Sequence, residues 1–221
     1  MIKATLGEKS PLLSVSAWVQ GGETNLDRLL GQVVLVEVFQ VNCPGCFLYS
    51  LPQAAELHRT YSGQGLTVLG VATAFEDFDK NNLDNLTRLA KNGEVVGETL
   101  RVLTLQNRLK ADRLPYRIPF PLAMDQLAPA QGEAADADNI AYFIKNRVPA
   151  YEQLPKAHQQ KIRQQVEHYF QSLDYHAVTF ERFGLKGTPS HILVDKQGLL
   201  RDCTFGAYPD LEARIRGLLQ E

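Results

Sequence analysis

The chain has 221 residues, 44% of them hydrophobic, and its 23 basic and 25 acidic side chains give a formal net charge of −2. A chain of this length buries enough apolar surface to fold without metal or disulfide support. Its charge balance excludes the basic field that a nucleic acid or an anionic lipid surface requires. Residues 1–9 lack the apolar stretch of a signal peptide, and Glu37 interrupts the densest apolar run. The sequence therefore predicts a cytoplasmic protein without a membrane span.

The N-terminal half predicts a strand–helix–strand unit. Residues 14–19 alternate in polarity, as in a short strand. Residues 33–39 are β-branched and apolar except for Glu37, which is typical of a strand that is buried on both faces. Apolar side chains then recur at helical spacing from 48 to 61, and residues 66–72 read as a second buried strand. The connection between these two strands is expected to be right-handed.

Further helices and a short strand follow this unit. Asp79 and Asn81 are candidate N-caps of a helix that carries leucines between residues 83 and 90. A second helical pattern covers residues 95–109. Residues 120–125 form a short strand pattern with an internal proline, which places this strand at a sheet edge or puts the proline at an entry point.

Residues 126–179 form an insertion before a closing hairpin. From 128 to 138 the composition is that of a loop, rich in Ala, Gly, Pro and acidic residues. Two amphipathic helical patterns follow, and they either cover apolar surface only or form one wall of a substrate groove or a dimer contact. Two strands within 192–205 and a helix from 209 to 219 end the chain, which is predicted to form one domain over residues 1–221.

The motif Cys43-Pro44-Gly45-Cys46 lies directly between the first buried strand and its helix. A cysteine at a helix N-terminus is stabilised as a thiolate by unpaired backbone N–H groups and by the helix dipole. Cys46, one turn further on, is close enough to attack a mixed disulfide formed at Cys43 and to release the reduced substrate. A CxxC pair at the strand–helix junction of such a unit therefore predicts thiol–disulfide exchange.

Two segments resemble the signatures of the thioredoxin superfamily. Residues 36–46 are similar to its active-site strand and helix start, and residues 187–198 are similar to its cis-proline loop and the following β-hairpin. Segments 31–36 and 120–125 resemble the TlpA-like, redoxin-type branch. The resemblance implies an α/β thioredoxin-like fold, with a central mixed sheet flanked by helices. An N-terminal extension precedes this fold, and the helical insertion 126–179 precedes the cis-proline hairpin.

The resemblance also implies roles for single residues. Pro189 is expected in the cis form facing the cysteine pair, and the backbone of Thr188 is expected to pair with a substrate chain. Asn42 stands where the family usually carries an aromatic residue, and Pro44-Gly45 reverses the order of thioredoxin itself. Asn42 and Pro44 are therefore candidate contacts with the substrate. The implied activity is reduction of a disulfide-containing protein substrate with electrons from a thiol donor, without a cofactor.

Glu37 lies six residues before Cys43, where the family often carries a buried acid. Burial makes a carboxyl group hold a proton more tightly, so Glu37 can take the proton that Cys46 must lose. The alternative is that Glu37 faces a polar seam or is paired by a lysine. The predicted catalytic residues are therefore Cys43, Cys46 and Glu37.

Three other functions stay open at this point. A peroxiredoxin-like peroxidase would carry Pro and Thr where this chain has Val36 and Gln40. A zinc site would need further ligands beside the CxxC pair, and the remaining cysteine and the histidines are scattered along the sequence. A non-enzymatic adaptor with the same fold is the third alternative, because Asn42 is unusual and the insertion is large.

Two more residues are interpreted from their positions. Cys203 lies on a short alternating strand and is interpreted as a buried structural cysteine. His191 lies two residues after Pro189, close to the site in sequence, but strand alternation can point its side chain away.

Overall fold

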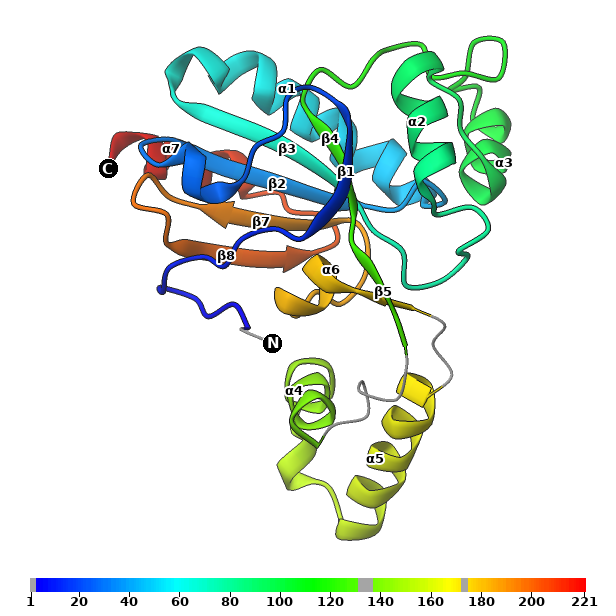
Figure 1. Cartoon of the computed structure of the whole chain (residues 1–221), viewed down its shortest axis with the longest axis vertical. Coiled ribbons are helices and arrows are strands. Elements are labelled where there is room, and N and C mark those ends of the chain that lie inside the picture. Colours follow the sequence, from blue (N-terminus) through cyan, green and yellow to red (C-terminus); the bar gives the residue numbers. More distant parts are fainter. Residues whose placement is uncertain (1–2, 131–136, 172–174) are drawn as a thin grey trace.

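Six strands of the described chain form one mixed sheet in the computed structural model, which describes residues 3–130, 137–171 and 175–221. The strands are β1 (Val15–Gln20), β2 (Val33–Phe39), β3 (Leu66–Ala72), β4 (Leu122–Asp125), β7 (Ser190–Val194) and β8 (Leu200–Phe205). Their order is β1-β4-β3-β2-β7-β8, with β2, β3 and β4 parallel and the other neighbours antiparallel. β2 therefore lies inside the sheet (Figure 1), and all of its residues are buried, as the sequence predicted.

Helices cover both faces of this sheet. They are α1 (Leu51–Tyr61), α2 (Leu83–Asn92), α3 (Gly97–Leu105), α6 (Val178–Arg182) and α7 (Leu211–Gln220). The apolar core on one face contains side chains of α1, α2, α3 and α7, and the core on the other face contains α6 and the N-terminal segment. The predicted α/β fold with a mixed sheet flanked by helices is confirmed. In the described residues, no helix combines the length and the apolarity that a membrane crossing requires.

Side-chain alternation along β2 separates the two cores. The valines at its even positions belong to the core beside α6. Leu35 and Phe39 belong to the core that also contains Cys46 and α1. Glu37 lies between Leu35 and Phe39 in this alternation, so its side chain points to the face of the sheet that carries Cys46.

The cap of α2 differs from the sequence prediction. Asn82, rather than Asp79 or Asn81, precedes the helix, and its side-chain oxygen accepts a hydrogen bond from the backbone N–H of Asn85 at 3.0 Å. Asn81 is buried, and its side-chain oxygen accepts a bond from the backbone N–H of Asn42 at 2.8 Å. The prediction was wrong because neighbouring polar residues fit the cap pattern equally well, while the bond that occupies Asn81 comes from a distant part of the chain.

The proline of the fourth strand lies at its entry and not at a sheet edge. Pro121 precedes β4, which begins at Leu122. β1 pairs with one side of β4 and β3 with the other, so β4 is an interior strand. Of the two possibilities that the sequence left for this proline, the structure shows the entry point.

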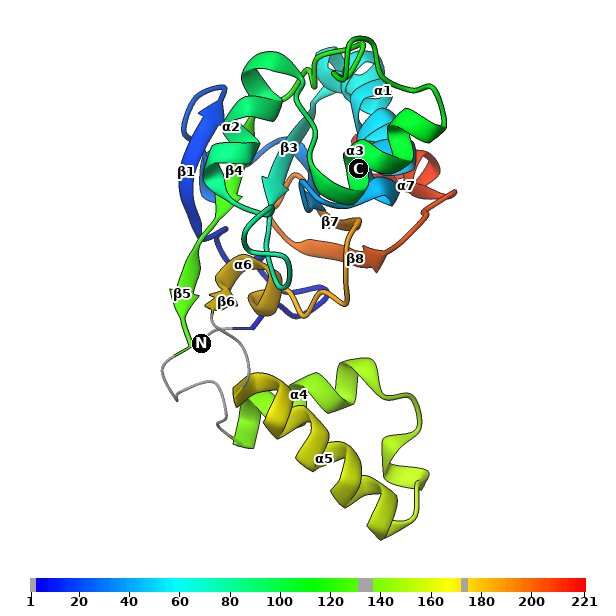
Figure 2. The ribbon, with the colours of Figure 1, turned by 90° about the vertical axis from the view of Figure 1, so that its right-hand side faces the viewer.

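The insertion 126–179 contains two short strands as well as helices. The strands β5 (Leu127–Pro129) and β6 (Tyr175–Ala177) pair antiparallel at its root. The helices α4 (Ala137–Arg147) and α5 (Lys156–Gln171) lie apart from the main sheet, beyond β5 (Figures 1 and 2). They bury a small core of their own, formed by Ile140, Ile144, Val166 and Phe170. Part of the predicted loop, 131–136, lies outside the described residues, as do residues 172–174.

A buried carboxyl group, Asp125, holds the returning chain against the end of β4. It accepts hydrogen bonds from the backbone N–H groups of Thr179 at 2.8 Å and Phe180 at 3.1 Å, and from the hydroxyl of Thr73 at 2.9 Å. Burial raises the pKa of Asp125 to about 6, because the loss of hydration outweighs these bonds. The protonated acid is thus favoured in the folded protein relative to the unfolded chain.

We therefore expect Asp125→Asn to change how stability depends on pH. The native protein holds the Asp125 proton more tightly than the unfolded chain does. Asp125 therefore adds up to about 3 kcal/mol to the free energy of unfolding below pH ~4, and this contribution is lost as the pH rises to about 6. Urea unfolding of both proteins at several pH values from 4 to 7, a range of about three pH units, measures this. A stability difference that stays constant over that range contradicts the expectation.

Candidate active site

The two cysteines of the CxxC motif form a disulfide at the C-terminal end of β2. Their Cα atoms are 5.4 Å apart. Cys43 is half-buried, whereas Cys46 is fully buried at the start of the π-helical turn η2 (Cys46–Ser50), which leads into α1. The backbone N–H of Cys46 lies 3.2 Å from the Cys43 sulfur and points toward it. A thiolate at Cys43 would therefore be both accessible and stabilised by a backbone donor.

The cis-proline loop lies against this pair. The peptide bond between Thr188 and Pro189 is cis, as predicted, and the Cys43 sulfur lies 3.7 Å from the Thr188 carbonyl oxygen. A Cβ atom added to Gly45 would lie 4.0 Å from Cδ of Pro189. The hydroxyl of Thr188 donates a hydrogen bond to Oε1 of the buried Gln40 at 3.1 Å. The structure thus brings together the two segments that resemble the superfamily signatures.

Asn42 and Pro44 occupy different environments at the rim of this site. Pro44 is half-buried beside the half-buried Cys43. The side-chain nitrogen of Asn42 donates to Asp77 at 2.7 Å, and its oxygen accepts from the backbone N–H of Glu98 at 2.6 Å, in the first turn of α3. Asn42 therefore connects the active-site segment to α3 and to the loop before α2. Its predicted contact with the substrate stays a prediction.

Gly97 permits the close approach of α3 to Asn42. Gly97 has φ +55°, and a Cβ atom added there would lie 2.5 Å from the side-chain oxygen of Asn42. Any other residue at this position would have to adopt left-handed backbone and displace Asn42. No sequence pattern indicates this contact, because Asn42 and Gly97 lie far apart along the chain.

Glu37 lies on the face of the sheet that carries Cys46, and it contacts His191. In the β2–β7 register Glu37 faces His191, and the imidazole Nδ1 lies 2.7 Å from the Glu37 Oε2. Glu37 is 0% exposed and His191 is 1% exposed. Of the alternatives that the sequence left open, the structure shows neither a lysine partner for Glu37 nor a His191 side chain that points away from it. The register between β2 and β7 sets Glu37 opposite His191, and this register cannot be read from the sequence alone.

The imidazole of His191 is held at both ring nitrogens. Nε2 lies 3.2 Å from the carbonyl oxygen of Gly206, and the ring centroid is 6.0 Å from that of Tyr208. Burial alone would lower the pKa of His191. The contact with Glu37 outweighs it, with smaller contributions from the Gly206 carbonyl and from Asp202, so the pKa lies above its ordinary value.

The third cysteine lies on the opposite face of the sheet. Cys203 packs against the core beside α6, whereas Cys43 and Cys46 belong to the core beside α1. Cys203 is a free thiol, and burial, together with the charge of Asp202, raises its pKa to about 12. Such a thiol is a poor nucleophile at neutral pH.

Among the described residues, no group of three or more His, Cys, Asp or Glu side chains is placed to hold a metal ion.

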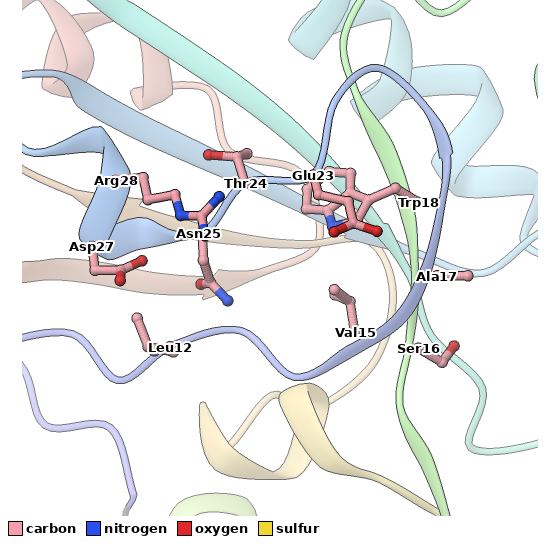
Figure 3. Close-up of a pocket in the computed structure, with 10 residues that line it drawn as sticks. All are labelled: Leu12, Val15, Ser16, Ala17, Trp18, Glu23, Thr24, Asn25, Asp27 and Arg28. Carbon is pink, nitrogen blue, oxygen red and sulfur yellow. The ribbon is translucent and has the colours of Figure 1, made fainter.

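A pocket of about 360 Å³ lies beside β1, away from the predicted site. It is open to solvent and lies between β1 and the 3-10 turn η1 (Leu26–Leu29) (Figure 3). Trp18, Glu23 and Arg28 are among its lining residues, and none of the predicted site residues lines it. The side chain of Asn25, which also lines it, is bound to both backbone groups of Leu13.

Solved structures of other proteins share this fold. A thioredoxin-like superfamily protein is 24% identical, with a TM-score of 0.51, over 96% of this chain and 97% of that one. A thiol-disulfide isomerase from Corynebacterium glutamicum is 26% identical, with a TM-score of 0.55, over 99% of this chain and 97% of that one. A Chlorobium tepidum protein proposed to be the thiol:disulfide interchange protein DsbE is 15% identical, with a TM-score of 0.50, over 99% and 97%. No family model and no curated protein matches the sequence.

The fold and the cysteine pair together define a class of protein. A CxxC disulfide at a strand–helix junction, with a neighbour described as a thiol-disulfide isomerase, supports a thiol-disulfide oxidoreductase in general. The chain has the fold of the thioredoxin superfamily, and the resemblance that the sequence motifs carried is confirmed at this level.

The contact between Asn42 and α3 yields a test of stability. We expect Asn42→Ala to lower the free energy of unfolding by about 1 kcal/mol, because α3 loses the acceptor for its first N–H groups. Gly97→Ala should cost about 2 kcal/mol or more, because it combines left-handed backbone with a collision. Chemical denaturation measures both.

Gly63→Ala is the matched control for these two variants. No atom lies within 4 Å of a Cβ atom added at Gly63, and its φ is not positive. Its stability should therefore stay within about 0.5 kcal/mol of the parent protein. Equal losses in Gly63→Ala and Gly97→Ala would show that the Asn42 contact does not restrict position 97.

Proposed function

We propose that this protein reduces disulfide bonds in protein substrates through Cys43 and Cys46, as a TlpA-like, redoxin-type member of its superfamily. The observation that carries the proposal is the meeting of the half-buried Cys43 with the cis-proline loop at 3.7 Å, while Cys46 is buried behind it. One cysteine is thus accessible to a substrate, whereas the other is shielded from solvent.

In the first step Cys43 attacks the substrate disulfide as a thiolate. The substrate S–S bond breaks, one substrate sulfur leaves as a thiolate, and the other becomes bonded to Cys43. The backbone N–H of Cys46, 3.2 Å from the Cys43 sulfur, stabilises the attacking anion. We assign the backbone of Thr188 beside Pro189 to the substrate chain, and the half-buried Pro44 to the rim that this chain crosses.

In the second step Cys46 resolves the mixed disulfide. Glu37 takes the proton of the Cys46 thiol, and the resulting thiolate attacks the Cys43 sulfur. The Cys43–Cys46 disulfide forms, and the second substrate sulfur leaves with the electron pair. Two electrons have then passed to the substrate, and an external thiol donor must restore the cysteine pair. The free thiol of Cys203 is compatible with a reducing compartment, and we propose the cytoplasm.

The order of the two cysteines can be tested by trapping. We expect Cys46→Ser to accumulate covalent mixed disulfides with a protein substrate such as insulin, because the resolving thiol is absent. Cys43→Ser should trap none, and both variants should lose insulin turnover. Non-reducing electrophoresis and a turbidity assay measure these outcomes. Cys203→Ser, which changes the half-buried thiol on the opposite face, is the control that should keep full turnover.

The outcomes separate the proposal from its alternatives. Equal trapping by Cys46→Ser and Cys43→Ser would overturn the assigned order. No turnover by the parent protein would favour an adaptor, and rapid consumption of hydrogen peroxide would favour a peroxidase. The reduction potential of the pair gives the direction of electron flow, since about −270 mV is typical of a reductant and about −120 mV of an oxidant.

The insertion offers a separate test of substrate choice. Its root contacts the site indirectly, because the ring of Tyr175 lies 5.4 Å from that of Phe78, in the loop whose Asp77 binds Asn42. Joining Pro129 to Tyr175 by a short Gly/Ser turn removes α4 and α5 and keeps the β5–β6 pair. We expect unchanged alkylation of Cys43 by a small reagent and an altered rate on protein disulfides. Unchanged rates on every protein substrate would limit the insertion to covering apolar surface.

A further inference from the structure

The buried pair of Glu37 and His191 has properties that the two-step exchange does not use. Among the described residues, neither carboxylate oxygen of Glu37 has a hydrogen-bonding partner besides the imidazole. On its other side, Glu37 faces Gly70 of β3, which has no side chain. Among the described residues, His191 is therefore the side chain that can share a proton with this carboxylate.

The position of the protons follows from the contacts of the imidazole. Nε2 faces the carbonyl oxygen of Gly206, which only accepts hydrogen bonds, so Nε2 carries a proton. Nδ1 faces Oε2 of Glu37 at 2.7 Å, and without a proton between them two lone pairs would meet in a buried site. The pair therefore holds one shared proton, and the carboxylate is ionised when that proton lies on Nδ1.

The surroundings favour the proton on the imidazole. Asp202 on β8 adds a negative charge that acts on His191. The carboxylate of Asp202 also contacts Arg214 of α7 at 3.5 Å and accepts a hydrogen bond from the hydroxyl of Tyr208 at 2.5 Å. The contact with Glu37 keeps the pKa of His191 above its ordinary value, although burial of the ring opposes this. A protonated imidazole beside an ionised carboxylate is net neutral, which the apolar core tolerates better than a lone charge.

We propose that His191 is a positioning residue for the proton transfer from Cys46. Its protonated ring holds Glu37 through Oε2 and keeps the carboxylate ionised, so that Oε1 remains free to accept the thiol proton. This inference rests on the proposed function, since it concerns the resolving step of the same site.

Atoms and charges balance in this step. The S–H bond of Cys46 breaks, an O–H bond forms at the Glu37 Oε1, and the electron pair stays on sulfur. The imidazolium of His191 then compensates the thiolate of Cys46, so the buried cluster stays neutral before and after the transfer. The thiolate attacks Cys43 and expels the substrate thiolate, which takes a proton from solvent. When a thiol donor reduces the disulfide again, Cys46 leaves as a thiolate and recovers the proton of Glu37.

The experiment isolates the resolving step with a small aromatic disulfide reagent. The reduced protein, in a Cys203→Ser background, releases one coloured thiolate when Cys43 attacks and a second one when Cys46 resolves. Stopped-flow absorbance from about pH 5 to about pH 9 separates the rate of the first release from the rate of the second. His191→Leu removes the partner of Glu37, and His191→Asn keeps a neutral donor near it.

In both His191 variants we expect the rate of the second release to reach half of its maximum at a higher pH than in the parent protein. The shift should be about one pH unit or more in His191→Leu. That shift makes resolution about tenfold slower on the acid side. His191→Asn should show the smaller shift, and the first release should stay unchanged in both. Because His191 acts through Glu37, the double variant Glu37→Gln/His191→Leu should be no slower than Glu37→Gln alone. Unchanged profiles for the second release, or fully additive losses in the double variant, would overturn the proposal.

A measurement that needs no change at His191 accompanies the kinetics. Nitrogen-15 NMR of the ring in the reduced parent protein should show both nitrogens protonated at neutral pH, and Glu37→Gln should lose the proton on Nδ1. A neutral His191 ring in the parent protein at that pH contradicts the inference. A parent protein that releases only one thiolate contradicts the proposed function instead, because Cys46 then fails to resolve at any pH.

Discussion

The antiparallel pairing of β2 with β7 joins the two halves of the site. Its register sets Glu37 opposite His191 and Val38 opposite Ser190, so the cis-proline loop ends where the pairing with β2 begins. The Cys43 sulfur and the Thr188 carbonyl are 145 residues apart in the chain and 3.7 Å apart in space. A slip of one residue between the strands would turn the whole set of side chains on one strand to the other face. The meeting of Cys43 with the cis-proline loop and the pairing of Glu37 with His191 therefore depend on one register.

Local composition predicted much of the fold and part of the site. β2 was recognisable because a β-branched apolar run has few alternatives to a strand in the middle of a sheet, and the CxxC motif was placed by the strand and the helix around it. The pairing of His191 with Glu37 depends on strand register, and the bond between Asn81 and Asn42 depends on chain packing. Neither leaves a periodic pattern in the sequence. β5 and β6 were missed because strands of three residues are too short to show alternation.

The asparagine before the first cysteine takes a structural role that an aromatic side chain cannot. An aromatic ring lacks the amide N–H donor and carbonyl acceptor through which Asn42 donates to Asp77 and accepts from the N-terminal turn of α3 at the same time. The backbone of Asn42 is also bound by Asn81. The residue therefore fixes the position of the cysteine segment relative to two neighbouring elements. A site whose rim is held in this way presents a pre-formed surface, which lowers the entropy cost of binding.

The antiparallel ladder of β5 and β6 has a consequence for how the chain varies. Leu127 pairs with Ala177, so the polypeptide leaves the part of the fold that carries the main sheet and returns to it on adjacent strands, about 5 Å apart. The entropic penalty of closing a longer excursion at such a point grows only slowly with its length. Asp125 secures the return independently of what lies between the two strands. The helical hairpin therefore lies at a point of the chain where a change in its length need not move the main sheet.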